Sequence, residues 1–258
     1  MSYVKLIELT KHFGKVRALD GFNLEIRKGE FVALLGPSGC GKTTALRALA
    51  GLQELDKGQI LVDEKDITFV AANKRNMGMV FQAYSLFPNL TAEENVAFGL
   101  QMRKVNKHDR IRRANELLEL VGLPSHAKRF AHQLSGGQQQ RVGVARALVQ
   151  KPRTLLADEP VASLDPATAE RLLGLMHDIC KTDGLTAVVS LHQVEFARRF
   201  ADRIIGLKGG AIVFDGTPDE LTGEQATALY GGTSLAAVQP DDPLSFPFTR
   251  LQTAGARI

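Results

Sequence analysis

A short run of glycines ends in a lysine and a threonine, a combination of residue types suited to hold phosphate groups. The run matches the spacing G-x-x-x-x-G-K-[ST] in full and consists of Gly36, Pro37, Ser38, Gly39, Cys40, Gly41, Lys42 and Thr43. It follows the apolar segment 31–35, and the residues 44–49 after it are expected to start a helix. The glycines let backbone amides converge on phosphate oxygens, and the helix adds the positive end of its dipole. Lys42 would neutralise the β- and γ-phosphates of a nucleotide, and the hydroxyl of Thr43 would contact Mg²⁺.

This run has a plainer alternative, a glycine-rich turn that contains a lysine by chance. Cys40 within it is either a reactive thiol or a small residue that fits the loop. The full match and its setting between a strand and a helix favour phosphate binding and the second interpretation of Cys40.

Two adjacent carboxylates, Asp158 and Glu159, form a second candidate group after the apolar segment 154–157. A carboxylate at the end of a buried strand can hold Mg²⁺ from the side opposite the threonine. Its neighbour Glu159 would polarise a water molecule for attack on the γ-phosphate. Alone, an apolar run followed by Asp-Glu is a common strand ending, but together with residues 36–43 it indicates nucleotide hydrolysis.

The segments that must position these groups include many short strands. Apolar or β-branched runs bounded by Gly, Asp, Asn or Lys predict strands at 4–9, 22–26, 31–35, 59–62, 77–81, 154–157, 186–191, 204–207 and 211–214. Lys208-Gly209-Gly210 predicts a hairpin between the last two strands, and Asp20-Gly21 predicts a turn before the strand 22–26.

The middle of the chain has a different pattern. From about Thr91 to Gln150 the apolar spacing becomes helical, and Thr91 with Glu94 forms a capping box that opens the first helix. A helical block between stretches of strand predicts a helical subdomain inserted in an α/β core.

Composition excludes several classes of protein. The 258 residues include 32 Lys plus Arg and 28 Asp plus Glu, and the resulting net charge of +4 is a weak argument for nucleic-acid binding. The basic groups at 110–113 and 198–203 are therefore interpreted as solvated helix faces.

No apolar run approaches the roughly 18 residues that cross a bilayer, and the N-terminus does not resemble a signal peptide. Two cysteines, Cys40 and Cys180, favour a reducing cytoplasm over a disulfide framework.

The pentapeptide that begins at Leu134, Leu-Ser-Gly-Gly-Gln, resembles the signature of the ATP-binding cassette family. Ser135 can cap the helix predicted at 138–149, while Gly136 and Gly137 let its amide end approach an anion. In the family this helix end, which includes Gln138, addresses the γ-phosphate of ATP held by a second copy. The resemblance thus implies a head-to-tail homodimer that shares two sites. A Ser-Gly-Gly turn before a helix is the structural alternative, and it leaves the other matching motifs unexplained.

Four further positions match the family's motifs in order. Phe13 lies where these cassettes stack an aromatic ring on adenine, usually Tyr or Trp. Gln82 matches the glutamine that meets Mg²⁺ or water. Asp165 matches a loop that helps organise the partner's site, although the preceding Ala-Ser departs from the commoner Ser-Ala order. His192 matches the switch histidine, which would contact the γ-phosphate and hold Glu159 and the attacking water in register.

The resemblance extends to about Leu221 and implies a P-loop NTPase of the α/β class, with an antiparallel β-subdomain and an inserted helical subdomain. We expect one ATPase domain over 1–230, its helical subdomain at about 83–150, and a C-terminal tail over 231–258. The implied catalytic residues are Glu159, His192, Gln82 and Lys42, and the implied Mg²⁺ contacts are Thr43, Gln82 and Asp158. ATP would contact Phe13, the loop 36–43, Thr44, the signature residues 135–138 and Asp165.

Cassettes of this family serve several kinds of machine. Those of DNA repair and chromosome maintenance carry a large insert, and too few residues separate Lys42 from Asp158 for one. Those of translation carry two cassettes in one chain, and this chain has one. We therefore expect the ATP-hydrolysing motor subunit of a membrane transporter, with a soluble ATPase outside transport as the alternative.

Because no membrane-spanning segment is predicted, the expected permeases are two separate integral membrane proteins, an arrangement similar to that of importers. The chain would then lie at the cytoplasmic face of the inner membrane as a peripheral subunit, in a complex that includes a solute-binding protein. The segment 82–91 looks like the importer segment that grips a coupling helix, with Tyr84 and Phe87 as docking aromatics. Local packing of these two rings is the alternative.

The transported solute is the least determined property. The segments 157–165 and 190–197 look most like phosphonate-import cassettes, whereas 76–98 resembles polyamine and metal-ion importers more generally. Motors for sugars and polyamines usually carry a further regulatory domain, and we expect none here. The expected solute is phosphonate or a related small phosphorus anion, with a polyamine, a metal ion or another small solute as alternatives.

Overall fold

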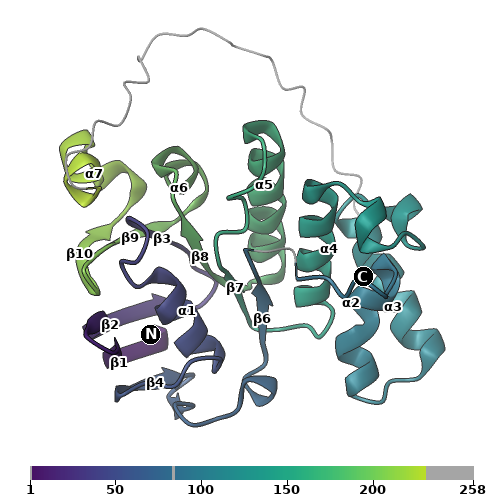
Figure 1. Cartoon of the computed structure of the whole chain (residues 1–258), viewed down its shortest axis with the longest axis horizontal. Helices are drawn as coiled ribbons and strands as arrows, with labels where there is room; N and C mark the ends of the chain where they lie inside the picture. The colour runs from purple at the N-terminus through teal and green to yellow at the C-terminus, as the bar shows by residue number, and fades with distance from the viewer. Residues whose placement is uncertain (1, 83–84, 231–258) are drawn as a thin grey trace, which may run out of the picture.

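Two β-sheets and the helices packed against them make up the fold, seen in Figure 1. The computed structural model describes residues 2–82 and 85–230. The helices are α1 (Lys42–Ala50), α2 (Ala92–Met102), α3 (Lys107–Leu120), α4 (Gly136–Leu148), α5 (Pro166–Asp183), α6 (Val194–Phe200) and α7 (Gly223–Leu229). Within the described ranges, no helix is both long and apolar enough to cross a membrane.

The larger sheet has six strands in the order β10-β9-β3-β8-β7-β6. They are β3 (Phe31–Leu35), β6 (Met77–Val80), β7 (Thr154–Ala157), β8 (Thr186–Leu191), β9 (Arg203–Lys208) and β10 (Ala211–Gly216). All neighbours are parallel except β9 and β10, which form the antiparallel hairpin predicted at Gly209-Gly210. Every residue of β3, β7 and β8 is buried, as expected for parallel strands covered on both faces.

Alternate residues of β3 pack into two different hydrophobic cores, one on each face of the larger sheet. Val32 and Leu34 of β3 pack with α1 and the smaller sheet. Phe31, Ala33 and Leu35 pack on the other face with helices α2 to α6. A phosphate-binding segment that follows β3 is therefore anchored from both sides of the sheet.

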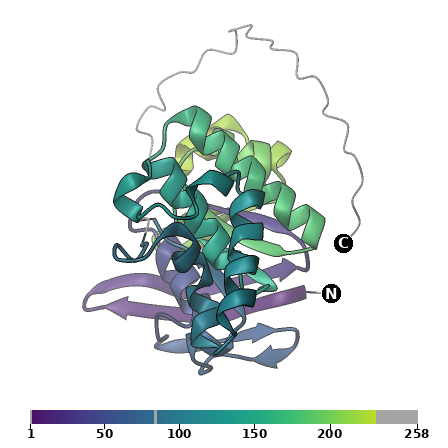
Figure 2. The same cartoon turned by 90° about the vertical axis from the view of Figure 1, so that its right-hand side faces the viewer.

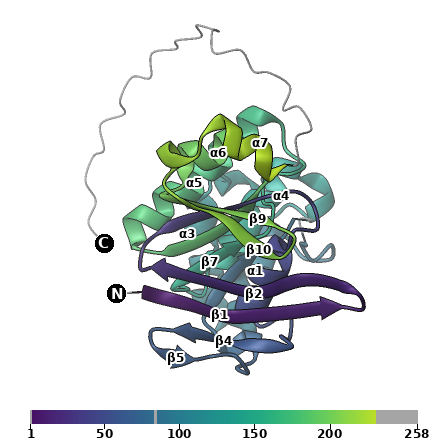
Figure 3. The same cartoon turned by 90° about the vertical axis from the view of Figure 1, so that its left-hand side faces the viewer.

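The smaller sheet is antiparallel, with the order β2-β1-β4-β5, and lies beside α1 and β10 (Figure 3). Its strands are β1 (Ser2–Phe13), β2 (Val16–Arg27), β4 (Lys57–Val62) and β5 (Lys65–Asp66). The turn predicted at Asp20-Gly21 is wrong, because β2 continues through both residues. Gly21 adopts φ of +62° where the β1–β2 register shifts, so its left-handed backbone forms a bulge and not a chain reversal.

The helices α2, α3 and α4 lie in the connection between β6 and β7, at the end of the molecule away from β1 and β2 (Figures 1 and 2). The predicted capping box is confirmed, since Thr91 and Glu94 bond reciprocally at the start of α2. The signature helix α4 begins at Gly136, two residues before its predicted start at 138. This architecture confirms the predicted fold class, whereas the proposed domain boundaries stay a prediction.

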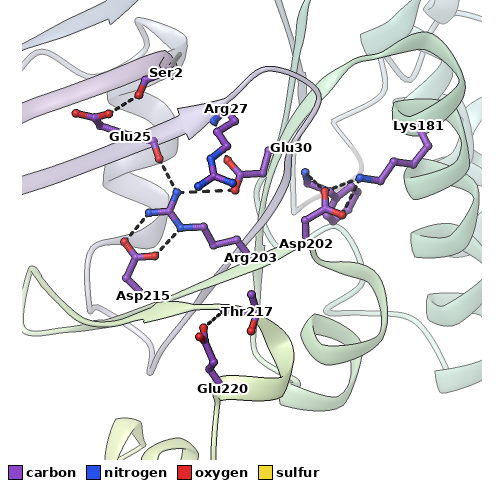
Figure 4. A network of polar contacts seen from close by, with 11 residues as sticks. Ser2, Glu25, Arg27, Glu30, Lys181, Asp202, Arg203, Asp215, Thr217 and Glu220 are labelled. Carbon is purple, nitrogen blue, oxygen red and sulfur yellow. Dashed lines mark hydrogen bonds and ion pairs between the residues drawn. The ribbon is translucent and has the colours of Figure 1, made fainter.

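One member of the second basic group lies on a strand and not on a helix. Arg203 lies on β9, where its guanidinium forms two hydrogen bonds to the carboxylate of Asp215 on β10 and one to the carbonyl of Glu25 on β2 (Figure 4). Nearby, Asp202 accepts a hydrogen bond of 2.7 Å from the amide of Phe31 and pairs with Lys181 of α5. These contacts hold the amino ends of β3 and β9, opposite the end where the phosphate-binding loop begins.

Candidate nucleotide site

The loop from Gly36 to Thr43 leaves the carboxyl end of β3 and leads directly into α1. Gly36 and Gly41 adopt φ of +149° and +110°. A Cβ atom would lie 2.3 Å from the carbonyl oxygen of Leu207 at the first position and 2.4 Å from that of Ala18 at the second. Both positions therefore require glycine, and the loop packs closely against β2 and β9.

Lys42 is almost fully buried, and its ammonium group lies over the backbone of its own loop. Nζ donates hydrogen bonds of 2.6 Å to the carbonyl of Gly36 and 3.1 Å to that of Pro37. It also lies 3.8 Å from the sulfur of Cys40, which is 3% exposed and packed inside the loop. This packing agrees with the interpretation of Cys40 as a small residue that fits. The buried ammonium group is positioned to pair with an anion held by the loop.

The threonine and the first carboxylate lie in direct contact. Thr43 Oγ1 donates a 2.8 Å hydrogen bond to Asp158 Oδ1, although 115 residues separate the two. Asp158 is 1% exposed, and its other oxygen lies 3.9 Å from Arg47 Nη2. A hydroxyl and a carboxylate are hard oxygen ligands, and Mg²⁺ in phosphate sites needs only one or two carboxylates beside phosphate and water. The donor set therefore fits Mg²⁺.

Glu159 and His192 face each other across the ends of β7 and β8. Glu159 Oε1 lies 2.6 Å from His192 Nε2, and the two side chains are 13% and 33% exposed. Glu159 has a φ of +46°, a strained value for a non-glycine residue. The geometry leaves a carboxylate reachable from solvent and oriented by an imidazole, which suits a group that activates water.

Ser190 is a residue that the sequence reasoning missed. Its hydroxyl donates to Asp158 Oδ1 at 3.1 Å and accepts a 2.8 Å hydrogen bond from the amide of Glu159. One hydroxyl on β8 thus orients both acidic residues. The available signal was a serine in the otherwise apolar end of a buried strand, two residues before His192.

Gln140 is a second missed residue, and it connects the signature helix to the segment that contains Gln82. Gln140 is 1% exposed, and its Nε2 donates a 3.1 Å hydrogen bond to the carbonyl of Phe81. Gln82 itself is exposed just after β6. The hydrogen bond to the neighbouring residue Phe81 therefore links the position of Gln82 to α4.

The signature residues form a separate group with Asp165. Ser135 caps α4 by accepting a hydrogen bond from the amide of Gln138, and Asp165 caps α5 by accepting one of 3.0 Å from that of Thr168. Hydrogen bonds from Thr168 also lower the pKa of Asp165. Ser135, Gly136, Gly137 and Asp165 line one open cavity of about 830 Å³, together with Arg141 and Arg171. No residue of the loop 36–43 lines this cavity, so the predicted ATP contacts fall into two groups.

Phe13 is a predicted ATP contact that lies neither in the loop 36–43 nor in the cavity around Ser135. It lies at the tip of the β1–β2 hairpin with 49% of its surface exposed. The ammonium group of Lys11 lies 5.7 Å from the centre of its ring. An exposed aromatic face on the hairpin is available for stacking on a flat ligand.

The chain is similar to the ATP-binding subunits of several importers. The sequence pattern described as ABC transporter matches residues 19–162. The spermidine/putrescine import ATP-binding protein PotA of Pasteurella multocida is 46% identical over 218 residues, which cover 84% of this chain and 59% of that protein. The phosphonates import ATP-binding protein PhnC 2 of Cupriavidus metallidurans is 48% identical, with 85% of this chain and 83% of that protein covered. The chain thus spans about three fifths of the length of the polyamine relative.

Solved structures show the same similarity in three dimensions. A dimeric structure of an ATP-binding cassette in a post-hydrolysis state, bound to ADP and phosphate, aligns with a TM-score of 0.76 and 37% identity over 83% of this chain and 98% of that chain. The structure of cbiO1 from Clostridium perfringens, part of the ABC transporter complex cbiONQ, aligns with a TM-score of 0.79 and 29% identity over 88% of this chain and 92% of that chain. Sequence and fold agree over more than four fifths of the chain, and it belongs to the ABC transporter family.

Proposed function

We propose that the protein is the ATP-hydrolysing motor subunit of a multi-subunit importer. One observation carries the proposal. The candidate groups follow the carboxyl ends of the adjacent strands β3, β7 and β8, and they are Lys42, the pair Thr43–Asp158 and the pair Glu159–His192. In open α/β sheets this edge is where ligands bind. The similar cassette with bound ADP and phosphate supports a triphosphate as the substrate.

In the proposed reaction the chain's residues bind the triphosphate and orient a water molecule. The loop amides and Lys42 hold the β- and γ-phosphates. Mg²⁺ bound by Thr43 and Asp158 would neutralise part of the phosphate charge. Glu159 accepts a hydrogen bond from the attacking water, and His192 holds that carboxylate in position.

We further propose that two copies pair head to tail. The cavity around Ser135 and Asp165 presents the amino ends of α4 and α5, and helix amino ends attract anions. Its residues are separate from the loop of the same chain, so a second copy would supply the phosphate. Two of the similar structures are dimers, which supports this arrangement.

Blocking the cavity tests the shared site. In a Glu159→Gln background, ATP should produce a dimer, and adding Ser135→Arg should remove it because a bulky cation fills the end of α4. ATP binding by the separate loop should change less than about threefold. Size-exclusion chromatography with light scattering measures the dimer, and fluorescent-nucleotide titration measures binding. A dimer that persists with Ser135→Arg would contradict head-to-tail pairing.

We propose that two integral membrane permeases dock near Gln82–Thr91 and place the motor at the cytoplasmic face of the inner membrane. Beside this segment lies a cavity of about 460 Å³ lined by apolar side chains that include Met79, Phe98 and Met102. Phe87 packs on Phe98 with ring centres 4.5 Å apart, yet 40% of its surface stays exposed. Contacts with Phe98 and other neighbours therefore cover only part of the surface of Phe87. Tyr84, the other proposed docking residue, lies outside the described residues.

Phe87→Ala should reduce transport by at least about fivefold while the ATPase rate of the isolated subunit stays within twofold of wild type. The reason is that a docking side chain contributes to the interface and not to the phosphate site. Transport is measured in vesicles that contain the purified complex, with Val213→Ala as an exposed apolar control on β10. Unchanged transport would contradict docking by Phe87. Purification without integral membrane proteins would favour the soluble ATPase alternative.

For the solute we propose phosphonate or a related small phosphorus anion, recognised by a separate solute-binding protein. The support is the pattern of residues 157–165 and 190–197. Relatives named for polyamines, phosphonates and sulfate are 44% to 48% identical, so sequence identity does not separate the three solutes. Stimulation of ATPase activity in the reconstituted complex by methylphosphonate, but not by spermidine or sulfate, would support the proposal. Stimulation by spermidine alone would favour the polyamine alternative.

A further inference from the structure

A tyrosine at the C-terminal end of the described chain contacts the candidate ATPase site. Tyr230 follows α7, and its hydroxyl donates a 2.7 Å hydrogen bond to the backbone carbonyl of His192, 38 residues away in sequence. This is the residue whose imidazole lies 2.6 Å from the carboxylate of Glu159. The backbone and the side chain of His192 are thus held by different elements.

The burial of Tyr230 determines the protonation state of this hydroxyl. Burial raises the pKa of Tyr230 to about 12, and a hydrogen bond from the Gly36 backbone acts in the opposite direction. The phenol therefore stays protonated at neutral pH and donates its proton to the hydrogen bond with His192. One side chain thus connects the end of α7 to the end of β8.

The helix α7, which Tyr230 directly follows, is itself packed on the larger sheet. Leu229 packs so closely on β9 that a Cβ on Gly206 would lie 2.9 Å from its Cδ1. Lys208 donates a 2.9 Å hydrogen bond to the carbonyl of Ala228. The tyrosine hydroxyl therefore has a rigid support, as a positioning group requires.

We propose that Tyr230 is a positioning residue for ATP hydrolysis, which holds the backbone of His192 so that the imidazole stays aligned with Glu159. The inference rests on the proposed ATPase function. Its effect passes through His192, because the hydroxyl contacts that residue's carbonyl and not the proposed water-activating carboxylate. Small displacements of a catalytic group lower rates by large factors, so the hydroxyl should matter more for turnover than for ATP affinity.

Removing only the hydroxyl tests this role. In the full-length protein, Tyr230→Phe should lower kcat about tenfold with the Kd for ATP within about threefold of wild type. Tyr3→Phe makes the same substitution at a buried tyrosine of β1 and should leave both values within twofold. Tyr230→Ala, which also removes the ring, should be at least as slow as Tyr230→Phe. If Tyr230→Phe turns over like wild type and only Tyr230→Ala is slow, the residue merely packs and the proposal is wrong.

A double-mutant cycle tests whether the hydroxyl of Tyr230 affects hydrolysis through the side chain of His192. With His192→Ala, adding Tyr230→Phe should change the rate less than twofold, as measured over hours with enzyme in excess of labelled ATP. A further tenfold loss in that background would overturn the route through His192. A wild-type protein that fails to hydrolyse ATP would refute the proposed function itself. Wild-type activity with an equally active Tyr230→Phe would refute only this inference.

Discussion

Replacing Glu159 by glutamine is expected to slow ATP hydrolysis by about 10²- to 10⁴-fold while ATP remains bound. The amide keeps the size of the side chain and can still meet His192, which lies 2.6 Å from the native carboxylate. It cannot accept a proton from the attacking water. Phosphate contacts from the loop are untouched, so the ATP-bound dimer should accumulate.

The measurements are the rate of phosphate release and the mass of the ATP-bound species. Glu54→Gln provides a matched control, because Glu54 is exposed and belongs to neither group of site residues. Hydrolysis by Glu159→Gln at the wild-type rate would show that another group activates the water. Loss of ATP binding would instead mean that Glu159 is needed to hold the nucleotide.

Replacing Lys42 by alanine is expected to weaken ATP binding by about 100-fold or more. Truncating one member of a buried charge pair typically costs about 2–5 kcal/mol. Lys42 is 3% exposed, so few water molecules could substitute for its ammonium group beside the β- and γ-phosphates. Hydrolysis at cellular ATP concentrations should be lost with binding.

Because Nζ also bonds to the carbonyls of Gly36 and Pro37, thermal unfolding of Lys42→Ala must be measured alongside nucleotide titration. Lys107→Ala removes an exposed lysine at the start of α3 and should leave binding unchanged. A folded Lys42→Ala protein that binds ATP with wild-type affinity would contradict the assignment of the loop.

Several elements were predictable because their signals are local. The strands β3, β7 and β8 have the bounds expected from sequence, since a strand buried on both faces is a mainly apolar run that is followed by a polar or glycine residue. The capping box at Thr91 and the two-glycine hairpin turn are equally local, because each depends on residues close together in the chain.

Other elements could not be predicted because a local signal has more than one structural solution. A glycine with positive φ serves a turn or a bulge equally well, and pairing with β1 selects the bulge at Gly21. Arg203 belongs to a basic cluster in sequence, yet it lies on a strand beside Asp215. Its charge is therefore paired instead of forming part of a solvated helix face.

The amino-acid sequence by itself determined the loop, the order of the motifs and the resemblance to the cassette family, since these reside in short runs of neighbouring residues. The tertiary structure decided how polar groups far apart in the sequence are hydrogen-bonded to one another. The order and register of β3, β7 and β8 place Ser190 between Asp158 and Glu159, and the docking of α7 brings Tyr230 to His192. Such hydrogen bonds join residues more than 30 positions apart, and local sequence does not encode the strand order and helix packing that create them.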